Sequence, residues 1–153
     1  MPARHENGHS KFDKQAVLET LNAILEMELA GAIRYTHYSF MVFGHSRIPI
    51  VSWLRGQASQ SMTHAQEAGD LVATHGGHPS LGIGKLLSSQ DKNIDGMLRE
   101  ILEHENSGAA LYEKLLSQVE GRHVALEEYA RRMIHDESND IAEIAKMLRK
   151  TGS

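Results

Sequence analysis

Residues 18–39 read LETLNAILEMELAGAIRYTHYS, and apolar side chains recur there every three or four positions. This spacing places them along one face of an α-helix that packs against a core. Glu28 stands in the middle of that face, where an isolated carboxylate is costly to bury. The full face consists of Leu18, Leu21, Leu25, Glu28, Ala32, Tyr35 and Ser39. The stretch therefore predicts a core-facing helix with a charge at its centre.

Three further stretches repeat this pattern, each with polar or ionisable side chains at the centre of an apolar face. The second face is Ile50, Leu54, Gln57, Ser61, His64, Ala68 and Leu71. The third is Ile94, Leu98, Ile101, Glu105, Gly108, Tyr112, Leu115 and Val119. The fourth is Leu126, Ala130, Met133, Glu137, Asp140, Ile144 and Met147. We therefore expect an all-α bundle of four helices, with Glu28, His64, Glu105, Glu137 and Asp140 pointing into one core.

The expected helices cover about residues 11–43, 49–75, 92–120 and 122–150. Ser10 and Asp91 are the expected N-caps of the first and third helices, and Pro49 suits the first turn of the second. The expected stops after a last turn are the glycines Gly44, Gly76, Gly77 and Gly121. Residues 1–10 are polar and are expected to form a flexible arm, so that the bundle comprises residues 11–150.

Connection lengths predict how these helices are ordered in space. The first and third connections are short, so each flanking pair of helices should be antiparallel. The second connection is about 14 residues long and reaches roughly 45 Å when extended. A helix of 27 residues is about 40 Å long, so this connection can return along the bundle. The second and third helices should therefore be parallel, which is the topology of bundles with one long crossover.

The inward polar residues all lie at half height. The expected helices have their midpoints near residues 27, 62, 106 and 136, close to the polar positions on every face. If the helix phases were wrong by about 100°, Glu28, Glu105 and Glu137 would instead face the surface. Nearby carboxylates in the sequence are Glu26, Glu103 and Asp136. Four buried carboxylates carry about four negative charges, which two divalent cations would neutralise. The convergence therefore predicts a metal site inside the bundle.

Composition excludes several other classes. The 153 residues suit one domain, and the net charge of −4 gives no basic field for nucleic acid. Cysteine is absent, so the chain has no disulfide and no thiolate site. No run of 18 apolar residues and no apolar leader is present, so we expect no membrane span and a cytoplasmic location.

These residues resemble the ferritin-like di-iron carboxylate proteins, and bacterioferritin most closely. The family pattern is one Glu from each of helices one and three and Glu-x-x-His from each of helices two and four. Here Glu28 is followed seven residues later by Tyr35, and the other helices carry Ser61-Met62-Thr63-His64, His104-Glu105 and Glu137-Ser138-Asn139-Asp140. The resemblance covers about residues 14–150.

The resemblance implies a ligand set for two metal ions. One metal would be held by Glu28, His64 and a bridging Glu137, and the other by Glu105, Asp140 and the same Glu137. Imidazole with carboxylates suits iron, manganese or zinc and does not distinguish them. In family members with a complete site Fe(II) is oxidised, which would make Glu28, Glu137 and Tyr35 the catalytic candidates.

Three features depart from the family pattern. Ser61 stands where the family has a glutamate that bridges the metals, and Asp140 stands where it has a histidine. Few residues follow the fourth helix, so the short fifth helix of cage-forming relatives is not expected. These departures leave a ferroxidase with weak activity as one interpretation. A non-enzymatic subunit with a degenerate centre, used for assembly, haem binding or slow metal storage, is an alternative, and a di-metal oxygenase acting on a small molecule is another.

Met62 lies between the second-helix positions of the site. In bacterioferritin a methionine at this place ligates haem across a two-fold interface, so the resemblance implies haem as a candidate cofactor. Methionine is also a common residue in apolar contacts between proteins. Apolar and small residues outside the core faces, among them Met27, Gly31 and Ala58, favour a homo-oligomer that is at least a dimer.

Overall fold

Four helices form the described part of the chain, which comprises residues 12–86 and 93–150 of a computed structural model. They are α1 (Lys14–Phe40), α2 (Arg47–Thr74), α3 (Ile94–Val119) and α4 (Val124–Leu148). The described residues contain no strand, so the predicted all-α class is confirmed. The expected arm, residues 1–10, lies outside the described residues.

The first helix begins later and ends earlier than the sequence predicts. Its N-cap is Asp13, whose carboxylate accepts a hydrogen bond of 3.1 Å from the backbone N–H of Ala16. The predicted cap, Ser10, lies outside the described residues. At the other end, the guanidinium of Arg47 donates a hydrogen bond of 2.6 Å to the carbonyl of Val42. That bond satisfies a carbonyl beyond the last turn and lets the chain leave the helix before Gly44, whose φ is 92°.

The other boundaries lie within a few residues of the predicted ones. Helix α2 starts two residues before Pro49, which therefore stands in a first turn, where a backbone N–H has no intrahelical partner. Asn93, rather than the predicted Asp91, caps α3 and accepts a bond of 2.8 Å from Gly96 N–H. Gly76 and Gly121 have φ values of 79° and 70° just after α2 and α3, as expected for helix C-termini.

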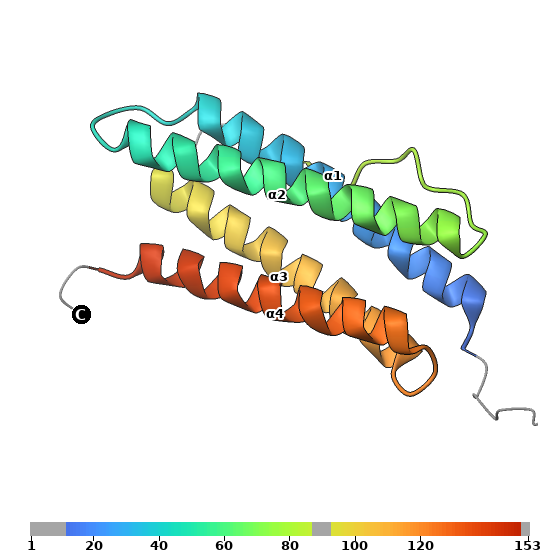
Figure 1. Cartoon of the computed structure of the whole chain (residues 1–153). Helices are drawn as coiled ribbons and strands as arrows, with labels where there is room; N and C mark the ends of the chain where they lie inside the picture. Colours follow the sequence, from blue (N-terminus) through green and yellow to red (C-terminus); the bar gives the residue numbers. More distant parts are fainter. Residues whose placement is uncertain (1–11, 87–92, 151–153) are drawn as a thin grey trace, which may run out of the picture.

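The crossover between α2 and α3 returns along the bundle, as predicted (Figure 1). The pairs α1–α2 and α3–α4 are antiparallel hairpins, and α2 runs parallel to α3. The crossover packs on α1, where Gly84 N–H donates to the carbonyl of Glu26 at 2.9 Å. The buried Arg34 holds the same segment through bonds of 2.9 and 2.7 Å to the carbonyl of Lys85. None of the described helices combines the length and apolar character needed to cross a membrane.

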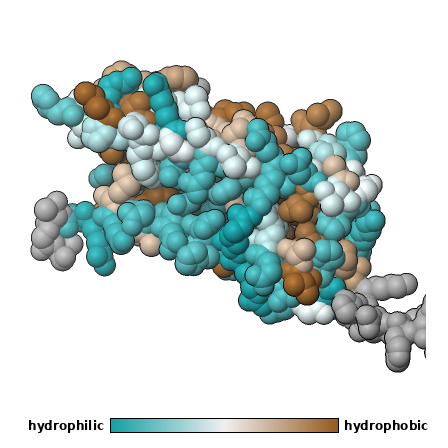
Figure 2. Space-filling model, viewed as in Figure 1, coloured by the Kyte–Doolittle hydropathy of each residue, from teal (hydrophilic) through white to brown (hydrophobic). Residues whose placement is uncertain are grey.

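Two apolar clusters fill the two ends of the bundle. Around Leu21, Leu115 and Met133, buried side chains of all four helices pack at one end. Around Tyr35, Leu54 and Ile144, a second cluster packs at the other end. The layer between them contains the buried polar side chains of the core faces. Figure 2 shows a largely hydrophilic face over α2 and α4, with apolar residues exposed at the α1–α2 turn and on the crossover.

Candidate metal centre

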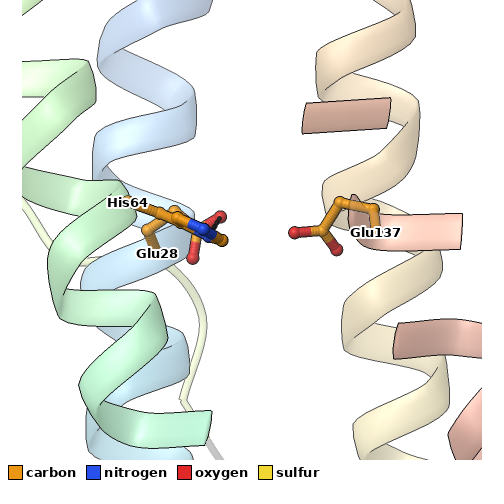
Figure 3. Close-up of side chains that lie close together, drawn as sticks. All are labelled: Glu28, His64 and Glu137. Atoms are coloured by element: carbon orange, nitrogen blue, oxygen red, sulfur yellow. Dashed lines mark ion pairs between the residues drawn. The ribbon is translucent and has the colours of Figure 1, made fainter. Parts of the chain in front are cut away.

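Each helix contributes at least one ionisable side chain to the layer between the two apolar clusters. Glu28 on α1 is 3% exposed, His64 on α2 is 8%, Glu105 on α3 is 7% and Glu137 on α4 is 3%. Asp140, one turn after Glu137, is half-buried. Figure 3 shows the carboxylate of Glu137 pointing from α4 toward Glu28 and His64. The core phase predicted from sequence is thus the phase that the helices adopt.

The five side chains form two groups that share one residue. Ligand atoms of Glu28, His64 and Glu137 lie within 4.8 Å of one another, and so do those of Glu105, Glu137 and Asp140. These are the two sets that the resemblance implied. Two ligands on one ion lie at most about 4.4 Å apart, because each bond is about 2.0–2.2 Å long, so small side-chain movements would bring each group onto an ion. Glu137 is the residue that could contact both ions.

The alternative carboxylates face elsewhere. Oε1 of Glu26 accepts a hydrogen bond of 3.0 Å from the Ser80 hydroxyl on the crossover. Glu103 is exposed on α3, and Asp136 belongs to neither group of candidate ligands. A helix phase that would direct these three side chains inward is therefore not the one observed.

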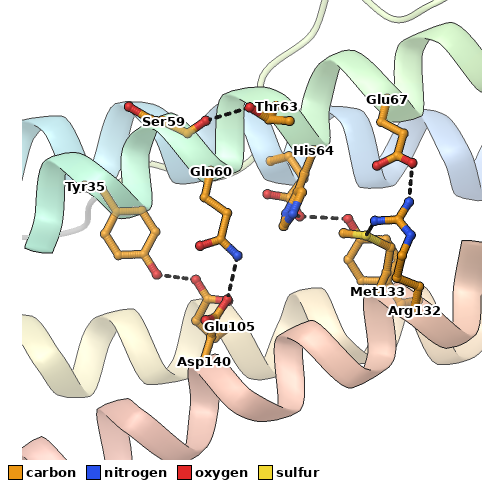
Figure 4. Close-up of polar contacts among 12 residues, drawn as sticks. Tyr35, Ser59, Gln60, Thr63, His64, Glu67, Glu105, Arg132, Met133 and Asp140 are labelled. Atoms are coloured by element: carbon orange, nitrogen blue, oxygen red, sulfur yellow. Dashed lines mark hydrogen bonds and ion pairs between the residues drawn. The ribbon is translucent and has the colours of Figure 1, made fainter.

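Two buried tyrosines hold two of the carboxylates. The hydroxyl of Tyr112 donates a hydrogen bond of 2.8 Å to Oε1 of Glu28. The hydroxyl of Tyr35 donates to Oε1 of Glu105 (Figure 4). Burial first, and then the neighbouring Glu105, raise the pKa of Tyr35 well above its ordinary value, so this phenol stays protonated and keeps donating. Both tyrosines lie on the predicted core faces.

His64 is paired with a carboxylate on the neighbouring helix. Its Nδ1 lies 3.5 Å from Oε1 of Glu28. Burial opposes the charged imidazole, but the hydrogen bond and charge of Glu28, with weaker contributions from Asp136 and Glu67, leave the pKa of His64 raised. Metal binds the neutral imidazole, so a raised pKa means that protons compete more strongly with a cation for His64.

The surroundings of Glu137 strongly favour the protonated form of its carboxyl group. Burial, followed by the hydrogen bond and charge of Glu105, raises the pKa of Glu137 far above its ordinary value. Its Oε2 is buried and has no hydrogen-bond partner among the described residues. An unsatisfied buried carboxylate oxygen is unfavourable, and a metal ion is one group that would satisfy it. The donor set and this oxygen therefore fit a divalent cation.

Asp140 is held from α2 by a residue that the sequence analysis did not single out. Nε2 of Gln60 donates a hydrogen bond of 3.2 Å to Oδ2 of Asp140, as Figure 4 shows. Burial and the charge of Glu105 raise the pKa of Asp140 to about 6. The core face predicted for this helix includes Gln57 and not Gln60, although Gln60 lies one turn before His64 and shares its face. That spacing was the available signal.

Ser61 is buried where the family pattern has a glutamate. It is 7% exposed and lies beside Gly31 of α1. Met62, the next residue, is 41% exposed and points away from the centre. It lines an apolar pocket of about 350 Å³ on the α1–α2 face, together with Ile33, His37 and Phe40.

Comparison with known proteins agrees with this architecture. A family model of the ferritin-like domain matches residues 18–152. A solved structure described as ferritin like, diiron-carboxylate proteins from Bacillus anthracis is 26% identical, with a TM-score of 0.83 over 89% of this chain and 97% of that chain.

Two more distant structures share the fold. An open pore ferritin from Archaeoglobus fulgidus is 18% identical, with a TM-score of 0.74 over 86% of this chain and 81% of that chain. A ferritin from Chlorobium tepidum is 16% identical, with a TM-score of 0.76 and the same two coverages. Comparison with curated proteins found no match. Because the family model covers most of the chain, this protein belongs to the ferritin-like domain family.

Proposed function

We propose that this protein binds two divalent metal ions, iron foremost, at the centre of its bundle. The observation that carries the proposal is the pair of ligand groups that share Glu137, each with its atoms within 4.8 Å. Four carboxylates from α1, α3 and α4 would neutralise two divalent ions. Manganese and zinc suit the same donors, so the residues alone do not select iron.

The residues of this chain have distinct proposed roles in that site. Glu28 and His64 would hold one ion, Glu105 and Asp140 the other, and Glu137 both. Tyr112 and Tyr35 would fix the orientation of the carboxylates of Glu28 and Glu105, which is what hydrogen-bonded outer residues do at metal sites. Bound iron would supply electrons for the reduction of oxygen or peroxide. Tyr35 remains our candidate for a redox-active side chain because it contacts a proposed ligand.

Anaerobic titration with Fe(II) or Co(II) by calorimetry tests this proposal. We expect two ions per chain and release of protons, because Glu137 and Asp140 have raised pKa values in the metal-free protein. Glu137→Gln should abolish the binding of at least one ion. Glu128→Gln, an exposed substitution on the same helix, is the matched control. Identical stoichiometry in wild type and Glu137→Gln would contradict the proposal.

A non-enzymatic role is the second candidate, and Ser61 is the observation that favours it. A serine cannot bridge two ions as a glutamate does, so the pair would be less tightly coupled. Tight binding of Fe(II) without faster oxidation in air would identify a storage or assembly subunit. The third interpretation, a small-molecule oxygenase, requires an apolar channel. The pocket beside the centre has a mixed lining, in which Glu26, Arg34 and Glu103 accompany apolar residues such as Met27 and Leu111.

We further propose that the pocket around Met62 is a contact between two copies of the chain, with haem as an alternative ligand. Its large apolar side chains, Ile33, Phe40 and Met62, are each more than 40% exposed in the single chain. Haem titration followed by absorbance distinguishes the two roles, because a Met-ligated haem has a distinct spectrum while a bare contact takes up no haem.

A further inference from the structure

The two departures from the family pattern change the donor set in a specific way. The pattern supplies four carboxylates and two imidazoles. In this chain Ser61 removes one carboxylate, and Asp140 replaces one imidazole with a carboxylate. The count of carboxylates therefore stays at four, with Glu28, Glu105, Glu137 and Asp140. What the candidate site lacks is a second imidazole.

His104 lies near Ser61, the position at which this chain lacks the family's bridging glutamate. It lies on α3, directly before Glu105, and is only partly exposed. A Cβ atom at Gly31 would lie 3.0 Å from Nε2 of His104 and 3.0 Å from the hydroxyl of Ser61. These two atoms are therefore separated by no more than twice that distance. The absence of a side chain at Gly31 is what lets an imidazole of α3 extend across α1 toward α2.

The surroundings of His104 leave it room to turn. Its ring also lines a pocket of about 400 Å³ between α1, α3 and the crossover, beside Met27 and Ala30. Its nitrogens lie outside both groups of candidate ligands found among the described residues. Binding of an ion by His104 would therefore require its imidazole to move inward past Gly31 by a change of side-chain torsion.

We propose that His104 is the second imidazole of the metal centre and binds an ion through Nε2 on the side that Ser61 leaves open. This inference depends on the proposed metal-binding function. A neutral imidazole adds a ligand without adding charge, so the balance between four carboxylates and two divalent ions is kept. A glutamate at position 61, with Asp140 present, would have added a fifth negative charge. The serine, the aspartate and the histidine are thus parts of one rearranged donor set.

Proton NMR of the Co(II)-loaded protein tests the inference by counting bound histidines. Each Co(II)-bound imidazole contributes one exchangeable, hyperfine-shifted resonance from its other ring N–H. We expect two such resonances in the wild type, and one in each of His104→Gln and His64→Gln. His135→Gln, at an exposed position on α4, should keep both and is the control. Calorimetry should show Co(II) affinity reduced about tenfold or more in His104→Gln.

A second variant keeps the test decisive if His104→Gln does not fold. Gly31→Ala retains both histidines but places a methyl group 3.0 Å from Nε2 of His104. It should shift or remove only the resonance assigned to His104. A Co(II)-loaded wild type with a single resonance that disappears in His64→Gln would overturn the inference and leave the metal site intact, as would a spectrum of Gly31→Ala identical to that of wild type. Failure of the wild type to bind Co(II) would overturn both proposals.

Discussion

The hydroxyl of Tyr112 on α3 donates a hydrogen bond of 2.8 Å to Oε1 of Glu28 on α1 and so joins the two helical hairpins across the candidate metal centre. Both side chains are buried, at 0% and 3% exposure. The carboxylate therefore depends on a protein donor in place of water, and the hydroxyl cannot be lost without leaving that oxygen unsatisfied.

Tyr112→Phe should lower the free energy of unfolding of the metal-free protein. A buried hydrogen bond to a charged acceptor contributes about 1.5–3 kcal/mol, which sets the expected loss. Urea denaturation followed by circular dichroism measures it. Tyr129→Phe is the matched control, because its ring packs edge-on against Tyr112 but its hydroxyl makes no hydrogen bond to the centre. Equal losses in the two variants would mean that the bond to Glu28 contributes nothing specific.

Glu137→Gln should have opposite effects on the metal-free and metal-loaded protein. Its carboxyl has a strongly raised pKa in the fold, so folding at neutral pH requires an unfavourable protonation or a buried charge. Gln removes that requirement, and we expect a gain on the order of 1 kcal/mol, or about 2–4 °C in Tm. Thermal unfolding with a chelator and then with excess Zn(II) should show the variant more stable in the first condition and less stable in the second. A lower Tm with the chelator would contradict this electrostatic account.

The metal-free protein should lose stability as the pH rises. The pKa of Asp140 is about 6 in the folded protein, above its ordinary value of 3.8, so between these two values the folded state binds more protons than the unfolded state. The free energy of unfolding is therefore highest below about pH 4 and falls as the pH rises to 6. The raised pKa of His64 acts in the same direction. Its contribution to the free energy of unfolding is complete below about pH 6.5 and is lost as the pH rises through the folded-state pKa. Metal binding should follow the opposite trend and strengthen as these groups deprotonate. Tm measured between pH 4 and 8, with and without Zn(II), should give slopes of opposite sign, and Asp140→Asn should flatten both.

Gln60→Ala should weaken metal binding, whereas Gln57→Ala should not. Gln60 holds Asp140 through a bond of 3.2 Å, and the loss of such a partner at a metal site typically costs about 10–100-fold in affinity. Competition with a coloured Zn(II) chelator measures the change. An equal loss in both variants would indicate a general effect of shortening α2 side chains.

Restoring the family donor set should accelerate Fe(II) oxidation. The double variant Ser61→Glu with Asp140→His regains the bridging glutamate and the second histidine while the number of carboxylates stays at four. We expect Fe(II) oxidation in air to be about tenfold faster than in wild type. The absorbance of Fe(III) in the near ultraviolet measures the rate. Ser61→Glu alone should gain less, because it adds a fifth negative charge to the cluster. A correctly folded double variant that binds two ions without any gain in rate would show that Ser61 does not limit the chemistry.

The sequence was sufficient for the fold and for the convergence of the centre. Helix midpoints and the three-to-four spacing placed Glu28, His64, Glu105 and Glu137 at one height, because a regular helix converts residue number directly into position. Cap positions were predicted less well. Asp13 and Asn93 cap the helices only because their side chains reach an N–H three residues on, and several nearby polar residues could have done the same.

The contacts between side chains of different helices could not be predicted from the sequence. The spacing of Gln60 from His64 places the two side chains on one face of α2, but it does not show that the amide reaches another helix. The crossing of α2 and α4 determines that Gln60 bonds to Asp140. The approach of His104 depends on the missing side chain of Gly31 in another helix. Such relationships depend on how two surfaces fit together, which periodicity along one chain does not encode.

The division of the candidate ligands between the hairpins has a consequence for assembly of the chain. The α1–α2 hairpin supplies Glu28 and His64, and the α3–α4 hairpin supplies Glu105, Glu137 and Asp140. Without metal, docking of the two hairpins brings like charges together. With metal, each ion would be bound by residues of both hairpins or by residues joined through Glu137, and so would hold the hairpins together. A protein cut in its crossover should therefore separate into two fragments that reassociate when a divalent ion is added, which would make the bundle a metal-dependent split protein.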